Sequence, residues 1–344
     1  MTTIWDLWSE ARNPPAEPTG LSFQDKAVLV TGANSGLGYA SAVKYAVLGA
    51  SPLILAVRSQ EKGDAARASI IHETGHTGEI IILILELSSF ESVNTFVNEL
   101  NERVAKLDVA LLCAGIVVPD YRTGSDGYEM TTQVNVLSNT LLALRILPKL
   151  RAAASSEGDC LPHLCFMNSL ASHAVDPEWL PSAGQTLLIG TLNDPSKFDL
   201  TRHYYLTKLA AWFAISRIAR VVEHSEANRD EHKVIINACC PGMCRTNMQR
   251  DLPWYMRLSQ QAFLLPLSRS VEEGSRSLVS ATGLGPESMG KLWRKSAGRF
   301  WREDGYLEPS DFLKSERGQE LADDTWNEIL AILQPYLDQG DFEF

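Results

Sequence analysis

Residues 27–38 read AVLVTGANSGLG, an apolar run followed by a loop with three glycines. The apolar run is typical of a buried strand, and the residues from Gly36 onward have a helical pattern. Glycines in such a loop let the backbone approach a pyrophosphate, and the N-terminus of the following helix attracts negative charge. A tight turn without a ligand is the alternative, but the strand-loop-helix context favours a dinucleotide site. The residues expected to form it are Gly32, Asn34, Ser35, Gly36, Leu37 and Gly38.

Short apolar runs alternate with helical patterns along the chain from residue 26 onward. Near-continuous apolar runs such as Val234-Ile235-Ile236 are expected where helices cover both faces of a sheet. The pattern predicts an α/β protein with a single Rossmann-type, doubly wound parallel sheet. The predicted strands are 26–31, 53–57, 80–85, 108–112, 163–168 and 234–239, and the predicted helices are 36–49, 60–73, 89–105, 124–150, 203–224 and 318–337.

Composition excludes several classes of protein. The 344 residues include 31 Lys+Arg against 42 Asp+Glu, a net charge of −11, with no run of five basic residues, which argues against nucleic acid as a partner. The longest apolar run, residues 80–85, is far below the roughly 18 to 20 residues that span a bilayer. With no secretory signal, we expect a cytoplasmic protein without an integral membrane segment. The cysteines at 113, 160, 165, 239, 240 and 244 lack metal-binding spacing, so we expect reduced thiols and no metal site.

We divide the chain into three parts. Residues 1–21 form an N-terminal extension with a short amphipathic helix around Trp5 and Trp8, and this helix is expected to dock on the protein or on a second subunit. Residues 22–250 form the catalytic domain, interrupted by an irregular insertion at 175–202. Residues 251–344 belong to the same domain and are expected to shape the substrate site with Trp254, Trp293, Phe300 and Trp301.

Tyr204 and Lys208 lie four positions apart on a predicted helix, so both side chains project from one face. Tyr205 has no such partner. A neighbouring ammonium favours the phenolate and is expected to bring the pKa of Tyr204 closer to neutrality. Taken alone, this spacing also occurs in ordinary helices.

Further residues complete a pattern: Cys113-Ala114-Gly115, Asn135, Ser169 and Pro241-Gly242. In this order and spacing, residues 22–250 resemble the short-chain dehydrogenase/reductase family, and within it the retinol-dehydrogenase-like and fungal secondary-metabolite branches. The resemblance implies NAD(P) across the carboxyl ends of the strands and a homodimer or homotetramer. By this resemblance, Tyr204 would transfer a proton to or from the substrate oxygen, and Lys208 would bind the nicotinamide ribose. Ser169 would position the substrate carbonyl, and Asn135 would anchor a water relay. The resemblance also places Glu86, Leu87, Ala114, Gly115, Pro241, Gly242 and Thr246 around the cofactor.

The charges after the second predicted strand indicate whether the site prefers NAD(H) or NADP(H). An NAD site places a carboxylate about 20 residues beyond the glycine loop, but the chain has Arg58 there, followed by Ser59 and Lys62. These residues favour the 2′-phosphate of NADP(H) over NAD(H). A solvated surface charge is the alternative for Arg58.

Three features depart from the family. Cys113 replaces an asparagine, Glu86 replaces an aspartate, and Ser169 precedes Tyr204 by 35 residues, where about a dozen are usual. Ser172 is a second candidate serine, but Ser169 directly follows the predicted strand. The insertion at 175–202 is therefore expected beside the site as a pocket wall or lid.

The sequence thus predicts an NADPH-dependent reductase or dehydrogenase that interconverts a carbonyl and an alcohol on a bulky apolar substrate. A secondary-metabolite intermediate is the expected substrate, and the direction of reaction stays open. The alternative is a redox-silent member of the fold, a cyclase, isomerase or ligand-binding protein.

Overall fold

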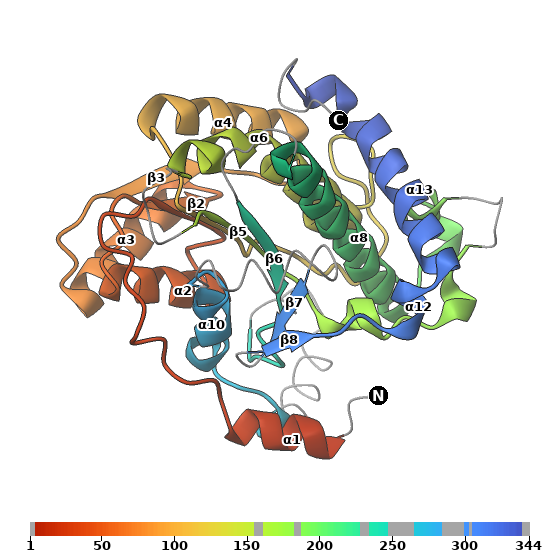
Figure 1. The fold of residues 1–344 in the computed structure, drawn as a ribbon, viewed down its shortest axis with the longest axis horizontal. Helices are drawn as coiled ribbons and strands as arrows, with labels where there is room; N and C mark the ends of the chain where they lie inside the picture. Colours follow the sequence, from red (N-terminus) through yellow and green to blue (C-terminus); the bar gives the residue numbers. More distant parts are fainter. Residues whose placement is uncertain are drawn as a thin grey trace.

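The computed structural model describes residues 4–154, 161–181, 187–227, 234–246, 265–283, 299–302 and 305–338. In this part of the chain, eight strands form one sheet in the order β3-β2-β1-β4-β5-β6-β7-β8 (Figure 1). All are parallel except β8, which runs antiparallel to β7. The strands are β1 (Val28–Thr31), β2 (Leu53–Val57), β3 (Ile80–Ile84), β4 (Val109–Leu112), β5 (His163–Met167), β6 (Ile235–Cys239), β7 (Arg299–Arg302) and β8 (Gly305–Leu307).

Helices cover both faces of the sheet (Figure 1). One face carries α2 (Gly36–Val47), α3 (Gln60–Thr74) and α10 (Val271–Ser280). The other carries α4 (Phe90–Arg103), α6 (Asn139–Ala153) and α8 (Leu200–Ala227), with α13 (Glu316–Leu333) outside α8. The shorter helices are α1 (Ile4–Arg12), α5 (Met130–Thr132), α7 (Leu188–Leu192) and α12 (Asp311–Lys314). The predicted doubly wound α/β fold is confirmed.

Successive side chains of each strand pack into the hydrophobic cores on opposite faces of the sheet, which explains the unbroken apolar runs. In β1, Leu29 packs toward α4, α6 and α8, whereas Val28 and Val30 pack toward α2 and α3. A strand buried on both faces has no polar side, so the sequence shows no alternation. The strand order reverses between β1 and β4, and such reversals open a crevice at the carboxyl ends of the strands.

Two predicted segments differ in kind from the structure. The helix predicted over 124–150 begins only at Met130, because Gly127 has φ +84° and Thr123 bridges Glu129 in a turn. The helix then passes through a π-helical turn, Gln133–Ser138, before α6. The insertion at 175–202, expected to be irregular, contains α7 and short 3₁₀ turns.

The N-terminal helix α1 matches the short amphipathic helix expected around Trp5 and Trp8. It contacts the 3₁₀ turn Leu265–Leu267. Of the aromatic residues expected to shape the substrate site, Trp254 and Trp293 lie outside the described residues, as do the side chains of Phe300 and Trp301. No helix in the described part of the chain is long and apolar enough to cross a bilayer.

Candidate active site

The glycine loop connects β1 to α2 at the point where the strand order reverses. Gly32 and Gly36 have φ +69° and +57°, backbone conformations that favour glycine. A Cβ on Gly38 would lie 2.4 Å from the carbonyl oxygen of Gly32, so the loop closes tightly only without a side chain there. Across the reversal, the Ala114 amide donates to Thr31 Oγ1 at 2.9 Å.

The first turn of α2 is suited to bind an anion. Ser35 is the N-cap, but its side chain makes no capping hydrogen bond. The N–H groups of a first helical turn lack partners within the helix and carry the positive end of its dipole. A Cβ on Gly36 would meet nothing within 4 Å, so space lies open beside it. These residues fit the pyrophosphate of a dinucleotide, as the sequence predicts.

Ser169, Tyr204 and Lys208 come together at the end of β5. Ser169 follows β5, and its hydroxyl and the hydroxyl of Tyr204 share a hydrogen bond. Lys208 lies one helical turn beyond Tyr204 on α8, with Nζ 6.0 Å from the centroid of the Tyr204 ring. Ser172 is buried and donates instead to the Ser169 carbonyl at 2.8 Å.

Burial is the largest cause of the pKa shifts of Tyr204 and Lys208. It raises the pKa of Tyr204, and the hydrogen bond from Ser169 only partly opposes that rise. The expected lowering by the ammonium is therefore wrong for the protein without a bound cofactor. Burial also lowers the pKa of Lys208 to about 8, since its ammonium is removed from water. At neutral pH the phenol keeps its proton and most Lys208 side chains keep their charge.

Asn135 lies in the π-helical turn and faces the segment after β4. Its Nδ2 donates to the Ile116 carbonyl at 2.8 Å, and its Oδ1 accepts from the Ile116 amide at 2.9 Å. A Cβ on Gly115 would lie 3.0 Å from the same Oδ1. Asn135 thus fixes the loop at Gly115, and its side-chain amide is already occupied. A water relay would have to use its backbone carbonyl.

The residues expected at the adenosine end lie after β2 and β3. Arg58 is exposed directly after β2, and Ser59 caps α3 by accepting from the Lys62 amide at 3.4 Å. Glu86 accepts from the Ser88 amide at 3.1 Å, and Leu87 is buried in the core. Among the described residues, neither the Arg58 nor the Lys62 side chain makes a hydrogen bond or ion pair, so both charges are free to meet an anion.

Pro241, Gly242 and Thr246 lie on the segment that follows β6. Gly242 has φ +75°, and a Cβ on it would lie 3.0 Å from Nη1 of Arg269. Arg269 is only 2% exposed, and its Nε donates to the Glu10 carbonyl of α1 at 2.8 Å. The sequence analysis missed this link between α1 and the loop, because nothing near Arg269 in sequence marks it.

Sequence reasoning also missed a buried hydrogen-bonded pair beside the site. His203 Nε2 lies 2.6 Å from Glu129 Oε2, and Glu129 also accepts from the amides of Thr131 and Thr132. These hydrogen bonds outweigh burial and lower the pKa of Glu129. Since His203 precedes Tyr204, the pair holds the first turn of α8. The position of His203 directly before Tyr204 was the sequence signal that could have identified this pair.

The insertion packs against the loop that precedes α5. Asn193 Oδ1 accepts from the Glu129 amide at 2.7 Å, and the Asn193 carbonyl accepts from the Tyr121 hydroxyl at 2.8 Å. The rings of Tyr121 and Phe198 meet edge to face at 6.0 Å. The insertion therefore lies beside the first turn of α8.

The chain belongs to the short-chain dehydrogenase/reductase family, a family of oxidoreductases. The family profile described as short chain dehydrogenase matches residues 26–174. The chain is 36% identical to the short-chain dehydrogenase/reductase ffsI of Aspergillus flavipes, over 94% of this chain and 90% of that one. It is 35% identical to the short-chain dehydrogenase/reductase phmF of Phaeosphaeria nodorum, with the same coverage of 94% and 90%.

Solved structures share the fold. An uncharacterised protein from Mycobacterium paratuberculosis is 21% identical, with a TM-score of 0.62 over 93% of this chain and 98% of that one. L-Sorbose reductase from Gluconobacter frateurii, solved with NADPH and L-sorbose, is 15% identical, with a TM-score of 0.55 over 76% and 91%.

Proposed function

We propose that the protein is an NADPH-dependent reductase that converts a ketone or aldehyde on a bulky apolar substrate to an alcohol. This proposal rests on one observation, the proximity of Ser169, Tyr204 and Lys208 beside the glycine loop. A redox-silent role would not require both the tyrosine and the lysine. Alcohol oxidation uses the same residues in reverse.

Tyr204 is the general acid of the proposed reaction. When bound, NADPH supplies the hydride to the carbonyl carbon. Tyr204 donates its proton to the carbonyl oxygen, and the Ser169 hydroxyl donates a hydrogen bond to the same oxygen as negative charge develops there. A phenol with a raised pKa enters this step protonated, which suits reduction at neutral pH. The ammonium of Lys208 stabilises the resulting phenolate and binds the nicotinamide ribose.

Arg58 and Lys62 support NADP(H) over NAD(H). Both side chains are exposed at the end of β2 and the start of α3, where a 2′-phosphate would lie. An arginine can bind a phosphate through two parallel hydrogen bonds. Backbone groups at Gly32–Gly38, Ala114–Gly115 and Pro241–Gly242, with Thr246, would hold the rest of the dinucleotide. Glu86 and Leu87 are assigned to the adenine side.

The similar fungal proteins support a proposal for the substrate and the location of the reaction. Both are fungal proteins named as short-chain dehydrogenase/reductases. We propose a secondary-metabolite intermediate as substrate and the cytoplasm as location. The insertion at 175–202 and the segment 251–344 would shape the substrate site, as parts of one catalytic domain over 22–250 and its extensions. A homodimer or homotetramer is the proposed assembly.

Absorbance at 340 nm, followed while purified protein acts on a panel of apolar ketones and aldehydes, tests the function. We expect NADPH to be consumed with at least one member of the panel, and the Tyr204→Phe variant to turn over the same compound about a hundredfold or more slowly. Tight NADPH binding without consumption across the panel, together with isomerisation or cyclisation of a panel compound, would favour the redox-silent alternative.

A further inference from the structure

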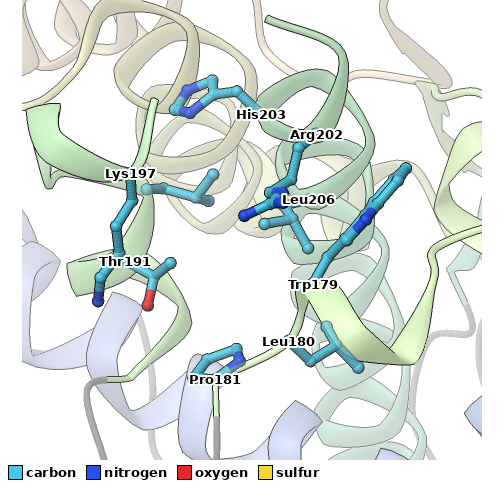
Figure 2. Close-up of a pocket in the computed structure, with 9 residues that line it drawn as sticks. Trp179, Leu180, Pro181, Thr191, Lys197, Arg202, His203 and Leu206 are labelled. Atoms are coloured by element: carbon cyan, nitrogen blue, oxygen red, sulfur yellow. The ribbon is translucent and has the colours of Figure 1, made fainter. Parts of the chain in front are cut away.

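A cavity of about 160 Å³ lies between the insertion and the first turns of α8 (Figure 2). Its apolar wall includes Leu180, Leu192 and Leu206, and the indole of Trp179 closes one side. Two cationic side chains, Lys197 and Arg202, also line it. Apolar surface and positive charge thus share one small space.

This cavity is separate from the proposed active site. Arg202 and Leu206 lie four apart on α8 and share one helix face, as do Tyr204 and Lys208. Arg202 and Tyr204 are two residues apart, and each residue turns by about 100° around the helix axis, so their side chains point about 200° apart. His203, which also lines the cavity, lies between these two faces, so the cavity opens on the side of α8 that is turned away from Tyr204.

The polar groups of the cavity lie on two sides of it. Figure 2 shows Lys197 and Thr191 on one side and Arg202 with Trp179 on the other, with open space between them. The buried Oγ1 of Thr191 has no hydrogen-bond partner among the described residues. A buried hydroxyl without a partner is costly, so a ligand oxygen that accepts its proton would be favoured.

The positive charge is only partly balanced. Arg202 lies 6.0 Å from the centroid of the Trp179 ring, and none of the ion pairs in the described part of the chain includes it. Lys197 lies 3.8 Å from Asp194, but both side chains are substantially exposed, and such pairs contribute little. The nearby carboxylate of Glu328 is held by the amides of Ile189 and Gly190 at the start of α7. An anion would find two cations without displacing a strong pair.

We propose that this cavity binds a single-ring aromatic carboxylate. Protein cavities of about 150 Å³ hold one benzene molecule, so the volume suits one ring. The ring would contact the leucines and the Trp179 indole, and the carboxylate would bind Arg202 and Lys197 and accept from Thr191. The site is additional to the proposed reaction and does not depend on it.

Titration with sodium benzoate, followed by saturation-transfer NMR of the benzoate protons, tests the site on the intact protein. We expect saturable binding that persists in saturating NADPH, because the cavity faces away from Tyr204. Benzamide, which has the same shape without the charge, should bind at least tenfold more weakly. Competition by NADPH, or equal binding of benzamide, would overturn the proposal.

Two variants locate the binding. Arg202→Gln and Lys197→Met should each weaken benzoate at least tenfold, since each removes one cation from the cavity. Both positions are exposed, so the fold should tolerate the changes. Arg67→Gln is the matched control, a half-exposed arginine on α3 that pairs with Asp64, and should leave binding unchanged. Unaltered binding in both cavity variants would contradict the assignment, as would the absence of saturable binding.

Discussion

At the residue scale, the neighbours of Tyr204 determine what its hydroxyl can do. Burial raises the pKa of the phenol, the Ser169 hydroxyl hydrogen-bonds to it, and Lys208 holds a charge one turn away. The sequence could predict these partners because each follows a local pattern: the end of a strand, or a four-residue spacing. It could not predict the sign of the pKa shift, since burial arises only when the elements pack.

Tyr204→Phe should lower turnover by about two to four orders of magnitude, the range for loss of a general acid. NADPH affinity should stay nearly the same, because only the hydroxyl is removed. Steady-state rates and a cofactor titration measure the two effects. Tyr205→Phe is the matched control and should keep its turnover, since Tyr205 has no lysine partner at four residues. Undiminished turnover in Tyr204→Phe would refute the assignment.

Lys208→Met should stabilise the protein while abolishing turnover. The pKa of Lys208 falls from 10.5 when unfolded to about 8 when folded, so burying its charge costs about 3 kcal/mol at pH 7. The unfolded state binds more protons between these values, so wild-type stability gains from this residue as pH rises from 8 toward 10.5. Urea unfolding at pH 7 and pH 9.5 should therefore show the advantage of the variant shrinking at the higher pH. An advantage that is absent at pH 7, or constant with pH, would contradict the lowered pKa.

Arg58→Asp should shift cofactor preference from NADPH toward NADH. The carboxylate would repel a 2′-phosphate and accept from a ribose 2′-hydroxyl instead. The ratio of NADPH to NADH dissociation constants, measured by nicotinamide fluorescence, should change by at least tenfold. Arg67→Asp, two turns further along α3, controls for the loss of surface charge. A ratio that does not move would identify Arg58 as a solvated surface residue.

At the element scale, regular strands and long helices were predictable, whereas short elements were not. β1 to β6 are apolar runs that match the predicted segments within two residues at their ends. The helix α7 has only five residues, and the Glu328 carboxylate of α13 accepts from its first amides. That contact joins positions 139 residues apart, so no local pattern contains it. The strands β7 and β8 are short, and β7 begins and ends with an arginine. Each residue of β7 pairs with a β6 residue 62 positions earlier, as Arg299 does with Asn237.

Gly38→Ala should disrupt the turn from β1 to α2. A Cβ at 38 would meet the Gly32 carbonyl at 2.4 Å, so the helix must shift away from the strand. We expect a loss of about 1–3 kcal/mol in the free energy of unfolding and at least tenfold weaker NADPH binding. Calorimetry and fluorescence titration measure these.

Gly75→Ala is the control for Gly38→Ala. Gly75 ends α3 with φ +66°, and a Cβ on it would meet nothing within 4 Å. Backbone strain should cost about 1 kcal/mol there and leave cofactor affinity intact. An equal loss of affinity in both variants would show that instability, and not the loop, governs binding.

At the scale of the whole molecule, the described part of the C-terminal segment 251–344 packs on helices from both faces of the sheet. Helix α10 packs on α2, and α13 packs on α8, where Arg217 Nε lies 2.6 Å from Asp323. Arg269 joins α1 to the loop after β6. The sequence predicted one domain around one sheet, but these contacts between distant segments depend on packing. The described part of 251–344 thus supports the helices that carry the site.

The central claim is that this chain binds NADPH through the glycine loop and Arg58, and it can be tested without a known substrate. Purified protein should be titrated separately with NADPH and NADH while nicotinamide fluorescence is followed. We predict saturable NADPH binding and at least tenfold weaker NADH binding, because a 2′-phosphate would bind the exposed cations after β2. Equal affinity, or tighter NADH binding, would contradict the cofactor assignment, and failure to bind either would contradict the proposed redox function.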